Sequence, residues 1–222
     1  MNILIIAPHP DDEVLGCGGT IAKYAARGDT ISVCYITSAY PPDWSEDYLV
    51  KKEKEIRRSN AILGISKRFN LNYPTVKLDT IPQKDLNASM QNVVQEVRPD
   101  CVFIPHWGDL NMDHRIVHDA SLIALRPINH RSSQILSYET LSETEWGTNP
   151  HSFHPQYYVD ISDTLETKIK AMEAFGTELK HSPHPRSIEG IRNLAFKRGS
   201  EVFTSAAETF MVVRIIDKKR VY

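Results

Sequence analysis

The sequence predicts an α/β fold: a Rossmann-like, doubly wound and mostly parallel sheet with helices on both faces. Three observations favour this class. Short apolar runs rich in β-branched residues alternate with longer segments of helical periodicity. The length of 222 residues suits a single domain, residues 1–222, with a substantial core. In addition, no linker, internal repeat or low-complexity segment divides the chain.

The first predicted strand, residues 3–7, is a short apolar run of the kind that lies buried in a parallel sheet. It ends at Pro8, because proline has no N–H to donate to the ladder of a central strand. Four residues that can bind a metal or carry protons follow it: His9, Asp11, Asp12 and Glu13. They therefore lie at the carboxyl end of the strand, where open α/β sheets bind ligands.

A helix over residues 13–27 is predicted next, because acidic residues favour a helix N-terminus and Gly28 ends the helical pattern. Its three glycines, Gly16, Gly18 and Gly19, do not have the GxGxxG spacing of a dinucleotide-binding loop. Close packing of the helix on a strand explains these glycines better.

The rest of the chain continues this alternation of strand and helix. A helix ends at Gly64, another ends before Pro99, and Ser162 suits the N-cap of a later one. The predicted strands after the first are residues 30–37, 69–71, 76–78, 101–105, 133–141, 157–161 and 208–216. The predicted helices are residues 13–27, 48–63, 81–97, 114–125, 163–175 and 187–198.

The imidazole and carboxylates after the first strand are ligand types that suit Zn²⁺. Two ligands do not hold a catalytic zinc, so a third must come from elsewhere. The best donor is His114, which follows the apolar strand 101–105 within DLNMDHRIVH. These two loops converge where the winding of the sheet reverses. One carboxylate, of Asp11 or Glu13, must stay off the metal if it is to take a proton from the bound water.

The stretch APHPDDEVLGCGGT, residues 7–20, resembles the HPDDE signature of the PIG-L/LmbE-type zinc-dependent de-N-acetylases. DLNMDH, residues 109–114, resembles their second, His-containing signature, and the likeness extends to about Leu125. The resemblance implies an LmbE-like fold in which Asp11 is the general base. It implies these ligands for Zn²⁺: His9, Asp12 and His114.

One position departs from the pattern of that family. Many relatives carry a histidine three residues before the metal-binding one, where it is thought to stabilise the developing oxyanion. Here the position holds Asn111, whose amide donates a hydrogen bond but carries no proton or positive charge. His184, on the proline-stiffened segment HSPHPRS (residues 181–187), is the candidate to replace that histidine. Arg186 beside it suits an anionic or hydroxylated ligand; the alternative is a stiff turn with a surface ion pair.

Four further residues are candidates for the surroundings of the metal. Asp113, directly before the metal-binding histidine, is expected to orient an imidazole or the base. His118 lies one helical turn beyond His114 and either assists a metal ligand or packs in the core. His106 and Asp109 are candidates for the mouth of the site.

The resemblance implies hydrolysis of an N-acetyl group on an N-acetylglucosamine-like sugar, carried by a small conjugate, sugar nucleotide or natural-product intermediate, with release of acetate. Tyr40 and Trp44, on the loop 38–47, either stack on the sugar ring or pack that loop. Two other functions stay open: a metal-dependent amidase for a non-sugar amide, and a catalytically inactive metal-binding sensor.

Charge and composition restrict the class of protein further. The formal net charge of −2 argues against a general nucleic-acid binder. No apolar run approaches the ~20 residues of a spanning helix and no leader is evident, so a cytoplasmic protein is expected. The three cysteines are spaced too widely for a disulfide framework or a CxxC metal pair. The resemblance implies a homo-oligomer, either a trimer or a hexamer.

Overall fold

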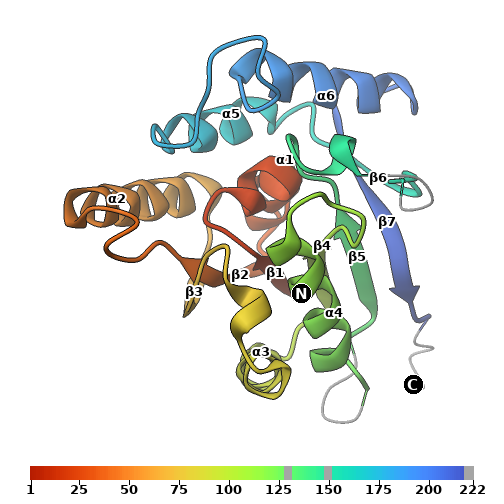
Figure 1. Cartoon of the computed structure of the whole chain (residues 1–222). Helices are drawn as coiled ribbons and strands as arrows, with labels where there is room; N and C mark the ends of the chain where they lie inside the picture. Colours follow the sequence, from red (N-terminus) through yellow and green to blue (C-terminus); the bar gives the residue numbers. More distant parts are fainter. Residues whose placement is uncertain (128–131, 148–151, 218–222) are drawn as a thin grey trace.

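The structure is a computed structural model, and it describes residues 1–127, 132–147 and 152–217. Its strands are β1 Asn2–Ala7, β2 Thr30–Ser38, β3 Lys67–Pro74, β4 Cys101–Pro105, β5 Gln134–Tyr138, β6 Tyr157–Asp160 and β7 Ala207–Ile215. They form one seven-stranded sheet in the order β3-β2-β1-β4-β5-β7-β6 (Figure 1). The first five strands in this order are parallel, and β7 is antiparallel to both of its neighbours. The predicted fold class is therefore confirmed.

Helices cover both faces of the sheet. They are α1 Asp12–Ala26, α2 Glu46–Leu63, α3 Gln83–Val97, α4 Met112–Ala124, α5 Leu165–Glu173 and α6 Ile188–Ser200, with short 3-10 turns η1 Leu78–Thr80 and η2 Thr144–Trp146. Helices α1, α2, α5 and α6 pack on one face, and α3 and α4 pack on the other (Figure 1). Strand β1 contributes side chains to the hydrophobic cores on both faces of the sheet. Ile3 and Ile5 belong to one core, and Leu4 and Ile6 belong to the other.

Two local predictions are wrong. Residues 76–78 are not a strand, because Val76 adopts a left-handed φ of 60° after β3 has ended at Pro74. Ser162 does not cap α5, which begins at Leu165; its hydroxyl and its N–H both donate to Asp160 Oδ1, at 2.6 and 2.9 Å. This pattern forms a local turn that competes with helix capping. The other elements occur where predicted, with shifted ends.

The glycines of α1 allow the helix to approach its neighbours closely. A Cβ atom at Gly16 would lie 2.3 Å from Tyr138 Cδ2, and one at Gly19 would lie 2.7 Å from Ile161 Cδ1. The predicted close packing is confirmed. Tyr138 is itself fixed, because its buried hydroxyl donates to the Ile6 carbonyl at 2.9 Å. These contacts hold the first turn of α1, and with it the polar cluster, against the sheet.

The described part of the chain contains no helix long and apolar enough to cross a membrane. Cys17, Cys34 and Cys101 are buried and form no disulfide. Burial raises the pKa of the Cys34 thiol to about 12, so this thiol stays protonated at neutral pH.

We expect Gly16→Ala to destabilise the protein by roughly 1–3 kcal/mol, because the new methyl group overpacks the contact with Tyr138. In an unconstrained helix the same change stabilises by about 1 kcal/mol, so the sign of the effect is diagnostic. Urea unfolding measures it. Arg58→Ala, at an exposed position of α2, is the control and should change stability by less than about 0.5 kcal/mol. A Gly16→Ala protein as stable as wild type would contradict the packing argument.

Candidate metal centre

A cavity of about 500 Å³ opens at the carboxyl edge of the sheet. Residues that follow β1, β2, β4 and β5 line it, together with one side of α2. Strands β1 and β4 are neighbours at the centre of the sheet. The next strand after β1 is β2, on one side of this pair, and the next strand after β4 is β5, on the other side. The cavity therefore occupies the topological switch point, where loops diverge and leave a crevice for ligands.

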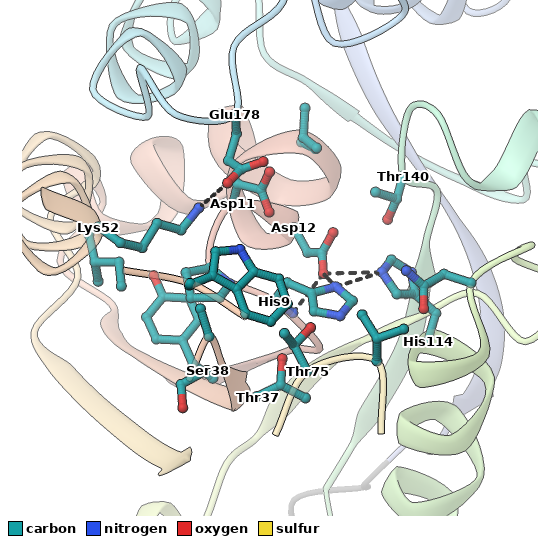
Figure 2. A pocket seen from close by; sticks show the side chains of 18 of the residues that line it. His9, Asp11, Asp12, Thr37, Ser38, Lys52, Thr75, His114, Thr140 and Glu178 are labelled. Atoms are coloured by element: carbon teal, nitrogen blue, oxygen red, sulfur yellow. Dashed lines mark hydrogen bonds and ion pairs between the residues drawn. The ribbon is translucent and has the colours of Figure 1, made fainter. Parts of the chain in front are cut away.

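Three side chains converge in this cavity, as Figure 2 shows. Asp12 Oδ2 lies 3.2 Å from both His9 Nδ1 and His114 Nε2, and the two ring nitrogens are 3.3 Å apart. Ligand bonds of about 2.0–2.1 Å in tetrahedral geometry separate ligand atoms by about 3.3–3.4 Å. The donors thus already have the spacing that zinc requires. Among the described residues, this is the one cluster of histidine, cysteine and carboxylate side chains close enough to hold a metal.

Two carboxylates determine which ring nitrogens face the metal position. Asp109 Oδ2 lies 2.8 Å from His114 Nδ1, and Asp113 Oδ2 lies 3.1 Å from His9 Nε2. A carboxylate accepts the N–H of each neutral ring, so the lone pair remains on the opposite nitrogen. Asp109 also accepts from the Thr144 hydroxyl at 2.6 Å, and Asp113 accepts from the Val76 N–H at 2.7 Å. Both imidazoles are therefore aimed by buried, hydrogen-bonded acids.

Hydrogen bonds and charge within the cluster raise the pKa of both imidazoles. Burial by itself would lower the pKa of His9, but hydrogen bonds to Asp113 and Asp12 outweigh burial and raise it to about 9. Burial opposes a proton on His114 as well, and there the charge of Asp12 and the bond to Asp109 raise the pKa. A metal ion must displace these protons, so binding releases them and depends on pH.

Asp11 lies beside the metal donors without joining them. Burial raises the pKa of its carboxyl group to about 7, against the opposing charges of Lys52 and Arg186. Its Oδ2 hydrogen-bonds to no described residue and lies 3.6 Å from Arg186 Nη1. The backbone is strained, with φ at 134°, and the Asp11 N–H donates to Glu13 Oε2 at 3.0 Å. Glu13 does not line the cavity. Of the two candidate bases, the geometry favours Asp11.

The opposite wall contains charged residues that the sequence analysis missed. Lys52 Nζ lies 2.8 Å from Glu178 Oε1, and the Tyr48 hydroxyl donates to the same oxygen at 3.0 Å. Arg186 Nη1 lies 3.5 Å from Glu178 Oε2 (Figure 2 shows Lys52, Glu178 and Asp11). The spacing of Tyr48, Lys52 and Ile56, which all line the cavity, could have identified one inward face of α2. No local pattern marks Glu178.

The predicted substrate residues divide into two groups. Trp44 and Arg186 line the cavity, and Tyr40 packs edge-on against Trp44 with ring centroids 5.5 Å apart. The structure does not place His106 and Asp109 at the mouth, as the sequence suggested. Both are buried: His106 packs edge-on against Phe153, and Asp109 binds His114. The prediction for these two residues failed because a loop at the carboxyl edge of the sheet can still bury individual side chains.

Three predicted residues have structural partners instead of a free position in the cavity. Nδ1 of His118 donates to the Pro105 carbonyl at 2.8 Å, and burial lowers the pKa of His118; this is the packing alternative. His184 does not line the cavity, and its Nδ1 accepts the Arg186 N–H at 3.0 Å. Asn111 does line it, but its Oδ1 caps α4 by accepting the Asp113 N–H at 2.9 Å. Only the amide NH₂ of Asn111 remains as a donor.

The sequence matches a known protein family and several curated proteins. The PIG-L family, GlcNAc-PI de-N-acetylase, matches residues 4–125. The deacetylase YaiS of Escherichia coli K12, described as uncharacterized, is 29% identical over 178 residues, which cover 78% of this chain and 89% of that protein. Diacetylchitobiose deacetylase of Thermococcus kodakarensis is 28% identical, over 77% of this chain and 67% of that protein. A probable N-acetyl-α-D-glucosaminyl L-malate deacetylase of Bacillus anthracis is 26% identical, with coverage of 80% and 81%.

Solved structures share the fold. The conserved protein TT1542 of Thermus thermophilus superposes with a TM-score of 0.79 at 24% identity, over 100% of this chain and 99% of that one. A 4-carboxy-2-hydroxymuconate hydratase of Pseudomonas putida also reaches 0.79, at 17% identity over 100% of both chains. The fold therefore accommodates more than one reaction, and the side chains of the site must decide among them.

We expect Asp109→Asn to weaken metal binding by roughly 10- to 100-fold, because an amide no longer holds the His114 ring in the required tautomer. Competition with a chelator measures the affinity. Asp119→Asn, an exposed position on α4, the helix that bears His114, is the control and should bind metal like wild type. Equal affinities in Asp109→Asn and wild type would show that Asp109 does not orient the ligand.

Proposed function

The chain belongs to the GlcNAc-PI de-N-acetylase (PIG-L) family, and from this premise we propose that it is a zinc-dependent hydrolase that removes the N-acetyl group from an N-acetylglucosamine-like sugar conjugate, releasing acetate. One observation carries the proposal. Asp11, a carboxylate that is not a metal donor, lies beside the converging side chains of His9, Asp12 and His114. Metal-assisted amide hydrolysis needs this combination of three ligands and one spare base.

The donor set supports zinc in particular. Two imidazoles and one carboxylate at tetrahedral spacing form the kind of three-ligand site that leaves a fourth position open. When bound there, zinc would supply a water of lowered pKa and a Lewis acid for the amide carbonyl. The residues that hold it would be His9, Asp12 and His114.

Asp11 would move the proton between the two halves of the reaction. Its Oδ2, which no described side chain hydrogen-bonds, takes a proton from the water as the water oxygen bonds to the carbonyl carbon. The same proton then passes to the amide nitrogen as the C–N bond breaks, because an unprotonated amine leaves poorly. Arg186, 3.6 Å away, would hold the Asp11 carboxylate in position by charge attraction.

The cavity suits a sugar derivative. Its volume of about 500 Å³ lies within the usual range for small-molecule sites. Polar side chains for hydroxyl groups line it, and Trp44 offers an aromatic face at its edge. The relatives named for diacetylchitobiose and for N-acetylglucosaminyl malate support an acetamido sugar as the reacting group. The cytoplasmic location and the trimeric or hexameric assembly expected from the sequence stay predictions.

Acetate release from a panel of N-acetyl sugars tests the proposal. The zinc-loaded protein is incubated with N-acetylglucosamine, diacetylchitobiose, N-acetylglucosaminyl conjugates and a sugar nucleotide, and a non-sugar acetamide is included. Turnover of a sugar supports the proposed function, whereas turnover of the non-sugar amide alone indicates an amidase. A zinc-loaded protein that binds a sugar without releasing acetate is the sensor that the sequence left open.

We expect Asp11→Asn to lower kcat by roughly 10²- to 10⁴-fold while zinc content stays at the wild-type level, because the base is lost and the ligands are intact. Asparagine has nearly the same shape as aspartate, so the substitution places no new steric demand on the backbone at this positive φ. Acetate assays and elemental analysis measure the two quantities. Asp119→Asn again serves as the control, and undiminished turnover in Asp11→Asn would remove Asp11 from the role of base.

A further inference from the structure

Thr140 has a buried hydroxyl group that lacks a hydrogen-bond partner among the residues that the structure describes. The residue is 1% exposed, and no described residue hydrogen-bonds to its Oγ1. It lines the cavity, and in Figure 2 its hydroxyl oxygen points toward the part of the cavity that holds Asp12 and His114. Buried polar atoms are nearly always hydrogen-bonded, so an orphan here calls for an explanation.

The backbone around Thr140 is fixed. Its N–H donates to the Thr144 hydroxyl at 2.8 Å, and its carbonyl accepts from the Glu143 and Thr144 N–H groups at 3.1 and 2.9 Å. Thr144 in turn donates to Asp109, which aims the metal ligand His114. The Leu110 N–H donates to the Glu143 carbonyl at 3.3 Å, joining this turn to the loop that bears His114. These hydrogen bonds therefore fix the position of Thr140 relative to the metal donors.

The reaction needs hydrogen-bond donors at the carbonyl oxygen, and Asn111, whose Oδ1 caps α4, offers only its amide NH₂ there. As the water oxygen bonds to the carbonyl carbon, the carbonyl oxygen gains negative charge, and hydrogen bonds aimed at it lower the barrier. His184, which the sequence favoured as this donor, does not line the cavity. Two buried side-chain oxygens in the cavity have no hydrogen-bond partner among the described residues, Asp11 Oδ2 and Thr140 Oγ1. One can accept a proton, and the other can donate a hydrogen bond.

We propose that Thr140 is a catalytic residue whose hydroxyl donates a hydrogen bond to the acetamido carbonyl oxygen as that oxygen becomes negatively charged. The inference rests on the proposed deacetylase function and names a hydrogen-bond donor for the carbonyl oxygen. The hydroxyl is neutral, so it donates this hydrogen bond without a change in its protonation state. On this proposal, Oγ1 has no hydrogen-bond partner among the described residues because its partner is the substrate.

Thr140→Val tests the proposal, because valine keeps the shape and removes the hydroxyl. We expect kcat to fall roughly 100-fold with KM little changed, since the bond forms in the transition state. Thr140→Ser, which keeps a hydroxyl, should restore most of the activity. The melting temperature of the metal-free Thr140→Val protein should equal or exceed that of wild type, because a hydroxyl without a partner is replaced by a methyl group.

Thr20→Val is the matched control. Thr20 is also fully buried with an Oγ1 that no described residue hydrogen-bonds, but it lies in α1 and does not line the cavity. The same chemical change there should leave kcat unaltered. A second readout does not depend on turnover: the affinity for the methylphosphonamidate of glucosamine, whose tetrahedral oxygens mimic the attacked amide. Thr140→Val should weaken it at least about tenfold and leave the affinity for glucosamine unchanged.

Three results would overturn the assignment. Thr140→Val could retain wild-type kcat and analogue affinity, it could bind less zinc, or it could melt at a lower temperature; the last two would indicate a structural role. Failure of the proposed function is distinguishable, because wild type itself would then neither release acetate nor bind the analogue, and both proposals would fall together.

Discussion

Two buried bonds between a carboxylate and an imidazole are the constraint on which the site depends. Asp109 holds His114, and Asp113 holds His9, so that the ring nitrogens facing the metal position each lie 3.2 Å from Asp12 Oδ2. Without these bonds each ring could rotate or adopt the other tautomer, and the three donors would not converge. Asp109 is in turn fixed by Thr144, and Asp113 by the strained turn at Val76. Support for the metal position therefore extends at least two layers into the protein.

The sheet supplies the rigidity for this arrangement. Strand β1 is buried on both faces, and the glycines of α1 let the helix lie close to Tyr138 and Ile161. The polar cluster is consequently placed by the most buried part of the fold. The strained backbone of Asp11 persists because Glu13 accepts its N–H, and Glu13 is itself bonded to the buried Tyr35 hydroxyl at 2.8 Å. Strain of this kind concentrates where a side chain must point in an uncommon direction.

Charge in the cavity is largely satisfied before any ligand binds. Lys52 and Arg186 both lie against Glu178, and Arg186 also approaches Asp11. These ion pairs hold in place the wall of the cavity opposite the metal donors. The carboxyl group of Asp11, the proposed base, stays partly desolvated. Asp11 Oδ2 and Thr140 Oγ1, which no described residue hydrogen-bonds, belong to residues that line the cavity where the reacting group would be bound. Arg186 Nε is a further buried polar atom of the lining that no described residue hydrogen-bonds, and such atoms indicate where substrate and water complete the network.

The sequence by itself determined the fold class, most strands and helices, and the three side chains that the structure brings together as a candidate metal site, because apolar periodicity and two short motifs are local signals. It also identified Asp113, which adjoins His114 in the chain. Only the tertiary structure decided that Asp109 turns inward to His114, that His184 stays outside the cavity, and that Lys52 meets Glu178, 126 residues away. Thr140 belongs to the same group. These are choices of partner between distant loops, and they depend on how each turn orients a side chain, which no short sequence pattern encodes.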